Sequence, residues 1–209
     1  MAFDLWLTFA AASLALLLVP GPTVLLVLSY ALSKGRSVAV ASAAGVALGD
    51  LVAMTASLAG LGAIVLASAT AFTVLKWIGA AYLVWLGVRL IRSAPSAGLE
   101  AQTMGRDVTA RSVFAHNAAV TALNPKSIAF FIAFVPQFVD PQAALLPQFA
   151  ILIATFVGLA ALNAMAYALL ADRLRRLISR PNVIAWITRA GGATLIGMGV
   201  LTATMRRAT

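Results

Sequence analysis

GAAYLVWLGV at residues 79–88 and GGATLIGMGV at residues 191–200 are two apolar stretches that share one pattern of small and large side chains. A weaker match joins GVALGDLVA at residues 45–53 to GLAALNAMA at residues 158–166, at nearly the same offset along the chain. Chance recurrence of Gly and Ala is the alternative in so apolar a sequence. Matches in the same order at nearly constant spacing instead favour an internal repeat.

Each copy of this repeat contains three apolar runs. About 20 apolar residues cross the hydrocarbon core of a bilayer as a helix. The runs of about this length are residues 5–32, 38–66, 74–91, 113–139, 147–170 and 183–204. Because three is an odd number, the second copy enters the membrane from the opposite side. The sequence therefore predicts an all-α integral membrane protein of six transmembrane helices arranged as two inverted three-helix repeats, a recurring architecture of secondary transporters.

The composition argues against most soluble classes of protein. Hydrophobic residues make up 62% of the 209 residues and charged residues 10%, whereas a soluble domain carries about 25% charged residues. The net charge of +9 does not indicate a nucleic-acid partner, because the basic residues lie mostly in short connections between apolar runs. The absence of Cys excludes disulfides and thiolate metal sites, and a single His disfavours a zinc enzyme. We therefore expect the lipid bilayer as solvent, no cofactor and no metal site.

The distribution of basic residues favours one orientation in the membrane. Lys and Arg are frequent in the first, third and fifth connections and scarce in the others, and such residues concentrate in cytoplasmic loops. Both termini are then expected on the periplasmic side. The one clearly polar segment, residues 93–111, lies in the third connection. We expect it to be a flexible cytoplasmic linker between a first repeat at residues 1–92 and a second repeat at residues 112–209.

Two proline motifs interrupt the first and fourth apolar runs near mid-bilayer. In Pro20-Gly21-Pro22 two prolines remove amide donors and clash with preceding carbonyls, so the helix must break or kink. Asn124-Pro125-Lys126 interrupts the fourth run at the corresponding place in the second repeat. Freed backbone groups at this depth are tolerated only beside buried protein or a water-filled cavity. A structural kink is the alternative for either motif alone, but paired breaks indicate a binding site.

Asp50 and Lys126 are the only charged residues deep in the apolar runs. An ionised side chain there costs at least about 2.5 kcal/mol, so each is expected to have a partner and a function. The two either form a structural ion pair or build a site where Asp50 binds protons or a substrate ammonium. Asn163, at the position that corresponds to Asp50 in the second repeat, would supply neutral hydrogen bonds. The residues predicted to bind substrate or ions are Pro20, Gly21, Pro22, Asp50, Asn124, Pro125, Lys126 and Asn163.

Several motifs follow one another in a fixed order along the whole chain. They are Val19-Pro20-Gly21-Pro22, Gly45 to Asp50, Lys76 to Leu83 with Trp85-Leu86-Gly87, and Asn124-Pro125-Lys126 followed by Phe130-Phe131 and Pro136-Gln137-Phe138. In order, spacing and total length this set resembles the LysE/RhtB family of amino-acid exporters. The resemblance implies a bacterial inner-membrane protein that exports an amino acid or a close derivative such as homoserine, homoserine lactone or threonine, driven by the proton gradient.

Two other classes of function remain as alternatives to a proton antiporter. One is a membrane-embedded enzyme with Asp50, Asn163 and His116 as its candidate groups, and the other is a passive channel or scaffold. The sequence shows no clustered nucleophile and base, no nucleotide-binding motif and no potassium selectivity-filter string. No catalytic residue is therefore predicted. Assembly into a homo-oligomer is left open by the sequence.

Overall fold

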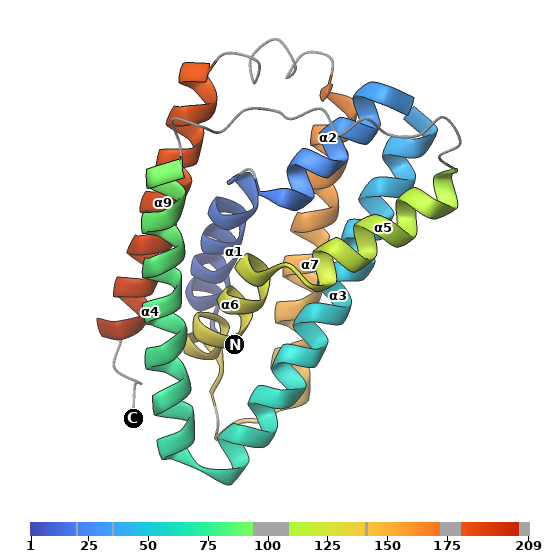
Figure 1. The fold of residues 1–209 in the computed structure, drawn as a ribbon. Coiled ribbons are helices and arrows are strands. Elements are labelled where there is room, and N and C mark those ends of the chain that lie inside the picture. Colours follow the sequence, from blue (N-terminus) through green and yellow to red (C-terminus); the bar gives the residue numbers. More distant parts are fainter. Residues whose placement is uncertain (20, 35, 94–108, 141, 172–180, 205–209) are drawn as a thin grey trace.

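Helices form nearly all of the described chain in the computed structural model (Figure 1). The structure describes residues 1–19, 21–34, 36–93, 109–140, 142–171 and 181–204. The helices are α1 (Phe3–Leu18), α2 (Pro22–Lys34), α3 (Arg36–Ala67), α4 (Ala69–Ser93), α5 (Ala110–Ala122), α6 (Pro125–Ala133), the 3₁₀ helix η2 (Val135–Phe138), α7 (Leu145–Leu169) and α9 (Pro181–Thr204). Within these ranges there is no strand, so the all-α prediction is confirmed.

Long apolar stretches suited to crossing a membrane occur in α3, α4 and α7, at Val38–Ala63, Thr73–Arg92 and Leu145–Leu169. Two more spans result if each bent pair of helices is one span: α1 with α2, bent by 56°, and α5 with α6 and η2, bent by 44°. The predicted breaks in the first and fourth runs lie at these bends. α9 has 24 residues and is not among the candidate spans found in the described residues. The described residues thus hold up to five candidate spans, against six predicted.

Prolines at the bends explain why the helices stop there. α1 is followed by Val19, whose backbone is extended at φ −70° and ψ 114°; Pro20 lies outside the described residues. α6 begins at Pro125, directly after Asn124 with φ −69° and ψ 111°, and α2 begins at Pro22. A proline at the first helical position lacks only an N–H that would have no partner in the helix. The residue before a proline is driven toward extended backbone. Each run therefore becomes two half-helices.

Two of the four half-helices, α1 and α6, lie at the centre of the bundle (Figure 1). α4 and α9 run side by side at one edge, and α3 packs against α5 and α7 on the other side. Between these groups lie α1 and α6, with α6 packed against α4 and α1 packed against α7. The ends of the broken spans are therefore enclosed by longer helices from both halves of the chain.

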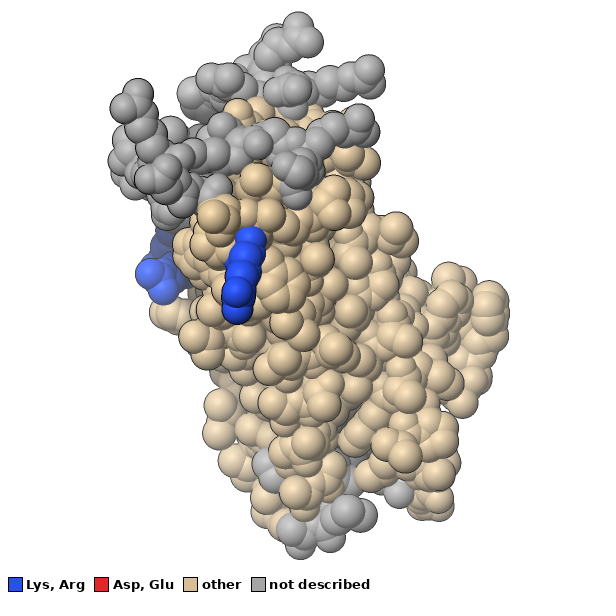
Figure 2. Space-filling model, turned by 90° about the vertical axis from the view of Figure 1, so that its right-hand side faces the viewer, with Lys and Arg blue, Asp and Glu red and all other residues tan. Residues whose placement is uncertain are grey.

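The surface of this bundle is apolar. Large hydrophobic side chains point outward along the long helices: Ile78 is 60% exposed, Leu162 70% and Trp186 73%. The face in Figure 2 shows little Lys or Arg and no Asp or Glu among the described residues. Apolar surface this extensive is typical of a protein that contacts lipid or a partner.

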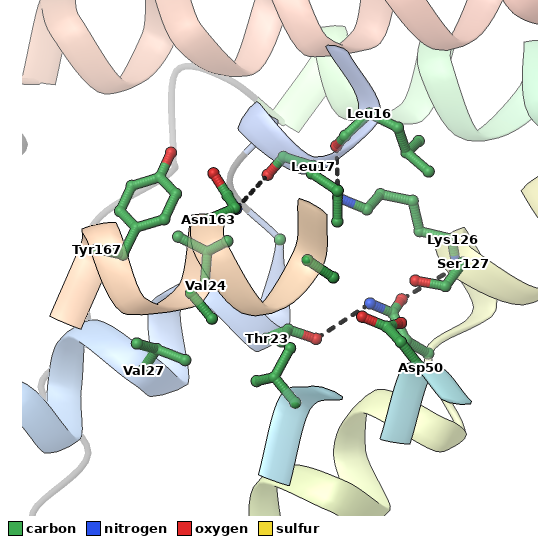
Figure 3. Close-up of a pocket in the computed structure, with 15 residues that line it drawn as sticks. Leu16, Leu17, Thr23, Val24, Val27, Asp50, Lys126, Ser127, Asn163 and Tyr167 are labelled. Atoms are coloured by element: carbon green, nitrogen blue, oxygen red, sulfur yellow. Dashed lines mark hydrogen bonds between the residues drawn. The ribbon is translucent and has the colours of Figure 1, made fainter. Parts of the chain in front are cut away.

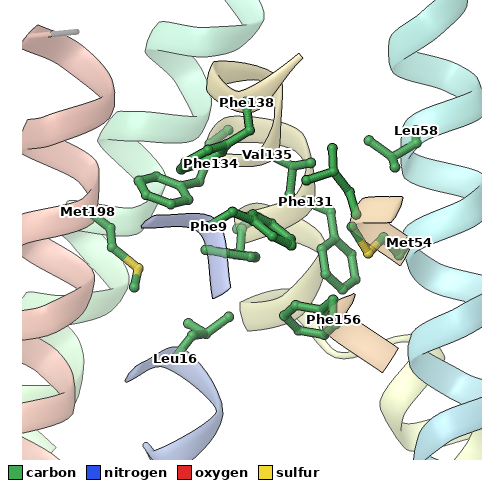
Figure 4. Close-up of a cluster of buried hydrophobic side chains, with 14 of the residues drawn as sticks. Phe9, Leu16, Met54, Leu58, Phe131, Phe134, Val135, Phe138, Phe156 and Met198 are labelled. Atoms are coloured by element: carbon green, nitrogen blue, oxygen red, sulfur yellow. The ribbon is translucent and has the colours of Figure 1, made fainter. Parts of the chain in front are cut away.

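A phenylalanine cluster holds α6 and η2 against their neighbours (Figure 4). Its members, all fully buried, are Phe9, Phe130, Phe131, Phe134, Phe138 and Phe156. The rings of Phe131 and Phe156 meet edge to face with centroids 4.7 Å apart. Aromatic pairs in such geometries contribute about 0.5–1.5 kcal/mol beyond the burial of their area. The cluster therefore fixes α6 to α1 and α7 immediately after the break in the fourth run.

Glycines let α4 and α9 touch through their backbones. A methyl group added to Gly87 would lie 2.5 Å from the carbonyl oxygen of Gly192, and one added to Gly199 would lie 2.7 Å from that of Ala80. Both distances are shorter than ordinary van der Waals contact, so only glycine allows the helices to approach this closely. We call the contact at these four residues the glycine seam.

The two contacts of the glycine seam occupy equivalent positions in the two halves of the chain. Aligning residues 79–88 with 191–200 pairs Gly87 with Gly199 and Ala80 with Gly192. The contact of Gly87 with Gly192 then becomes the contact of Gly199 with Ala80, which the structure also contains. The neighbouring side chains follow the same exchange: Ile196 lies beside Gly87, and Val84 lies beside Gly199.

Candidate functional site

The N-termini of two half-helices meet at the breaks. Asn124 caps α6, since its Oδ1 accepts the backbone N–H of Lys126 at 3.0 Å. Its Nδ2 donates to Oγ1 of Thr23 at 3.2 Å, and Thr23 lies in the first turn of α2. The first N–H groups of a helix have no partner within it and favour negative charge. One asparagine thus joins two helix ends that both attract an anion.

The C-terminal end of α1 faces the same place with the opposite polarity. The last carbonyls of a helix lack intrahelical partners, and in α1 they accept bonds from α6 and α7. The bonds are Lys126 Nζ to Leu16 O at 3.2 Å and to Val19 O at 3.0 Å, Asn163 Nδ2 to Leu17 O at 3.1 Å, and Tyr167 Oη to Leu18 O at 3.2 Å. Figure 3 shows Lys126 and Asn163 reaching this end of α1. Because unpaired backbone groups at membrane depth cost several kcal/mol each, these three side chains allow α1 to end inside the protein.

A cavity of about 30 Å³ lies between the breaks. It is large enough for a few water molecules, at roughly 10–15 Å³ for each. Its polar lining consists of Thr23, Asp50, Asn124, Lys126, Ser127, Asn163 and Tyr167, and its aliphatic lining includes Val24, Val27, Val46, Ala160 and Ala164. In Figure 3, Val24 and Val27 lie on the side of Tyr167, away from Asp50 and Ser127. The cavity therefore has a charged end and an aliphatic end.

Asp50 is the only acid among the described residues that line this cavity. Its surface is 2% exposed, and its Oδ1 has no hydrogen-bond partner among the described residues. Lys126 lines the same cavity, but its ammonium donates to the backbone of α1. The ion pair considered from the sequence is thus not formed through this oxygen. A buried carboxylate oxygen without a hydrogen bond is costly, so Oδ1 of Asp50 favours a proton or a cationic ligand.

Five of the predicted site residues line the cavity. They are Gly21, Asp50, Asn124, Lys126 and Asn163. Pro22 and Pro125 begin α2 and α6, the half-helices that present the site. Pro20, also predicted, lies outside the described residues.

Three polar lining residues were not predicted: Thr23, Ser127 and Tyr167. Thr23 and Ser127 each lie in the first turn after a break, so their positions beside the two proline motifs were a usable signal. Tyr167 lies four residues after Asn163, which places both side chains on one face of α7. The helical period applied to Asn163 would have identified it.

Nearly the whole chain, residues 14–206, matches the family model described as LysE type translocator. The chain belongs to this family. The LysE-type chain is 33% identical over 208 residues to the homoserine/homoserine lactone efflux protein of Salmonella typhimurium, with 100% of both chains covered. It is 30% identical to the leucine efflux protein of Klebsiella pneumoniae over 138 residues, 66% of this chain and 65% of that protein. An uncharacterized membrane protein of Vibrio cholerae is 34% identical over 206 residues, 99% of this chain and 100% of its own.

The family resemblance predicted from the ordered motifs is confirmed by these matches. No solved structure matches the chain.

Proposed function

We propose that the protein exports an amino acid or a close derivative across the bacterial inner membrane. Membership of the LysE family and full-length similarity to a homoserine/homoserine lactone efflux protein support this function. The structural observation that carries it is the cavity between the paired breaks, where two helix N-termini and one acid face the same space. Such a site offers one partner to each charge of an amino acid.

The substrate carboxylate binds at the N-termini of α2 and α6. Both ends carry N–H groups free of intrahelical partners, and Asn124 holds them together. The substrate ammonium binds Asp50, whose Oδ1 lacks a partner among the described residues. An aliphatic side chain then extends toward Val24 and Val27. A cavity of about 30 Å³ is too small for an amino acid, so the substrate enters only after the helices move apart.

Transport proceeds by alternating access between two inverted repeats, residues 1–92 and 112–209, with α9 as the sixth span. The glycine seam supports the inverted arrangement, because its two contacts are exchanged when the repeats are exchanged. The bends in the first and fourth runs support it as well. In this scheme α1 and α6 move against the longer helices and open the cavity first to one side and then to the other.

Export is driven by proton antiport at Asp50. Proton and substrate ammonium compete for one carboxylate, so a proton that enters displaces the substrate that leaves. The burial of Asp50 supports this role, since a carboxylate with 2% exposure exchanges ligands only through the cavity. Asn163 and Lys126 keep their hydrogen bonds to α1 while the cavity is closed.

The odd-numbered connections lie in the cytoplasm, and both termini lie in the periplasm. This orientation follows from the bias of Lys and Arg toward cytoplasmic loops. The linker proposed at residues 93–111 is then cytoplasmic; its residues 94–108 lie outside the described part of the chain. In the structure α4 ends at Ser93 and α5 begins at Ala110.

The enzyme alternative finds less support in the arrangement of its candidate groups. Nδ1 of His116 forms a hydrogen bond of 2.8 Å with Oη of Tyr30. His116 is not among the residues that line the cavity with Asp50 and Asn163. An acid–base pair for catalysis at this site would need the imidazole within hydrogen-bond reach of the same space.

Counterflow in proteoliposomes tests the proposed function. Vesicles loaded with unlabelled homoserine, threonine or leucine should take up the same labelled amino acid transiently above its equilibrium level, because a carrier exchanges solute. Asp4→Asn, at an exposed position in the first turn of α1, should behave like the wild type and serves as the charge-matched control for Asp50→Asn. Simple equilibration of every substrate would indicate a channel, and chemical conversion would indicate an enzyme; either result contradicts the proposal.

A further inference from the structure

The C-terminal end of α1 has four consecutive backbone carbonyls that each accept a hydrogen bond from a side chain. They belong to residues 16–19. Two of them, Leu16 O and Val19 O, share one donor, the Lys126 ammonium, at 3.2 and 3.0 Å. The C-terminal end of a helix carries a partial negative charge that favours cations. In secondary transporters, the C-terminal ends of half-helices coordinate monovalent coupling ions. The oxygens around Lys126 are thus of the type that binds a free cation.

The surroundings of the ammonium fit a cation site as well. A methyl group on Gly21 would lie 3.4 Å from Lys126 Nζ, so the ammonium sits directly against the backbone of the break. Asp50 lines the same cavity, and its Oδ1 has no hydrogen-bond partner among the described residues. The other titratable side chain in the lining, Tyr167, donates to the neighbouring carbonyl of Leu18.

We propose that the broken end of α1 is a monovalent-cation site and that the Lys126 ammonium is its resident cation, held by a covalent tether from α6. The Lys126 side chain thus joins the C-terminal end of α1, in the first broken run, to the N-terminal end of α6, in the fourth run. Opening the cavity then requires Lys126 to leave these carbonyls, and in the native protein no free metal ion is needed to occupy them. Lys126 is on this basis a positioning residue for α1.

Truncation of Lys126 tests the site because it removes the tethered cation and leaves space for a free one. The probe is methylammonium chloride, with tetramethylammonium chloride at equal concentration as the control, since the larger cation has the same charge but no N–H donor. Lys126→Ala should unfold in detergent at least about 3 °C below the wild type in tetramethylammonium. Methylammonium should recover part of that loss, while the melting temperature of the wild type should be the same in both salts.

Two matched variants test whether methylammonium acts at the space left by Lys126 or stabilises the protein elsewhere. Lys126→Met keeps an unbranched stem in the space and should be destabilised without responding to methylammonium. Arg189→Ala removes a positive charge from an exposed position on α9 and should show no difference between the two salts. A response in either variant would mean that methylammonium stabilises the protein nonspecifically, which overturns the proposal.

The proposal is also overturned if Lys126→Ala melts at the wild-type temperature in tetramethylammonium, or melts at one temperature in both salts. If this variant is not recovered folded, the amount inserted in membranes of cells grown with each salt becomes the measurement, and equal amounts in the two salts would likewise overturn it. The inference concerns the site of the proposed function, but melting temperatures need no transport. Failure of counterflow by the wild type would therefore count against the exporter and leave the cation site standing.

Discussion

Alanine substitutions in the glycine seam should destabilise the protein equally at its two equivalent positions. In Gly87→Ala the new methyl group would lie 2.5 Å from Gly192 O, and in Gly199→Ala it would lie 2.7 Å from Ala80 O. The obstructing atoms are backbone, so the helices must separate by roughly 1 Å to restore ordinary contact. Such overpacking costs about 1–3 kcal/mol, offset in part by the helix propensity of Ala, about 1 kcal/mol above that of Gly.

Two other helical glycines provide the matched controls. Gly158 in α7 and Gly197 in α9 have nothing within 4 Å of an added methyl group. At these two positions Ala gains helix propensity over Gly without a clash, so each substitution should raise the free energy of unfolding by up to about 1 kcal/mol. The seam variants and the controls should therefore differ by about 2 kcal/mol, or roughly 4–8 °C in melting temperature for a chain of this size.

Thermal unfolding of the four purified single variants in one detergent measures these differences. If Gly87→Ala and Gly199→Ala lower the melting temperature by similar amounts while the controls do not, close backbone contact at symmetric positions is supported. Loss of stability at Gly197→Ala as large as at Gly199→Ala would refute the reasoning, because the two residues lie on one helix and only one of them contacts α4.

Four further results are expected. Asp50→Asn should lose proton-driven accumulation in vesicles and exchange substrate more slowly than Asp4→Asn, because the amide neither takes up a proton nor pairs with the substrate ammonium; undiminished accumulation would remove Asp50 from the coupling mechanism. Pro125→Ala should lower transport more than it lowers the folded amount in the membrane, since a continuous helix loses the free N-terminus of α6; wild-type export would make the break merely structural. Tyr167→Phe should lower the free energy of unfolding by about 0.5–1.5 kcal/mol because Leu18 O loses its donor, and unchanged chemical denaturation would count against that bond. In this Cys-free chain, Ala2→Cys should react with an impermeant reagent in sealed cells and Ser96→Cys should not; the opposite pattern would invert the proposed topology.

The broken helices were predictable from the sequence because proline acts locally. Pro125 removes an amide donor and restricts Asn124 whatever surrounds them, so the bend follows from two adjacent residues. Asp50 was predictable for a similar reason, since a charge in an apolar run needs a function wherever the helix packs. These are properties of single positions.

The partners of those residues were not predictable in the same way. Lys126 and Asp50 line the same cavity, but the hydrogen bonds of the Lys126 ammonium go to the carbonyls of Leu16 and Val19, which no sequence pattern indicated. Which acceptor it reaches depends on the distance between α6 and the end of α1, and composition and spacing do not fix this distance. α9 shows the converse difficulty, because the repeat indicated a span there although α9 is not among the candidate spans of the described residues.

The glycine seam has a consequence for the ancestry of the chain. In the glycine seam, α4 and α9 contact each other through equivalent residues. A helix with such a surface can pair with a second copy of itself, so one gene can supply both partners. A half-length ancestor containing only the segment that became α4 would already have met another copy of itself, inserted in the opposite orientation, through the contact now made by Gly87, Gly192, Gly199 and Ala80. On the inverted-repeat scheme proposed above, duplication and fusion would then have fixed the orientation of each copy, and Asp50 and Asn163, which the alignment of the repeats pairs, would have been free to diverge.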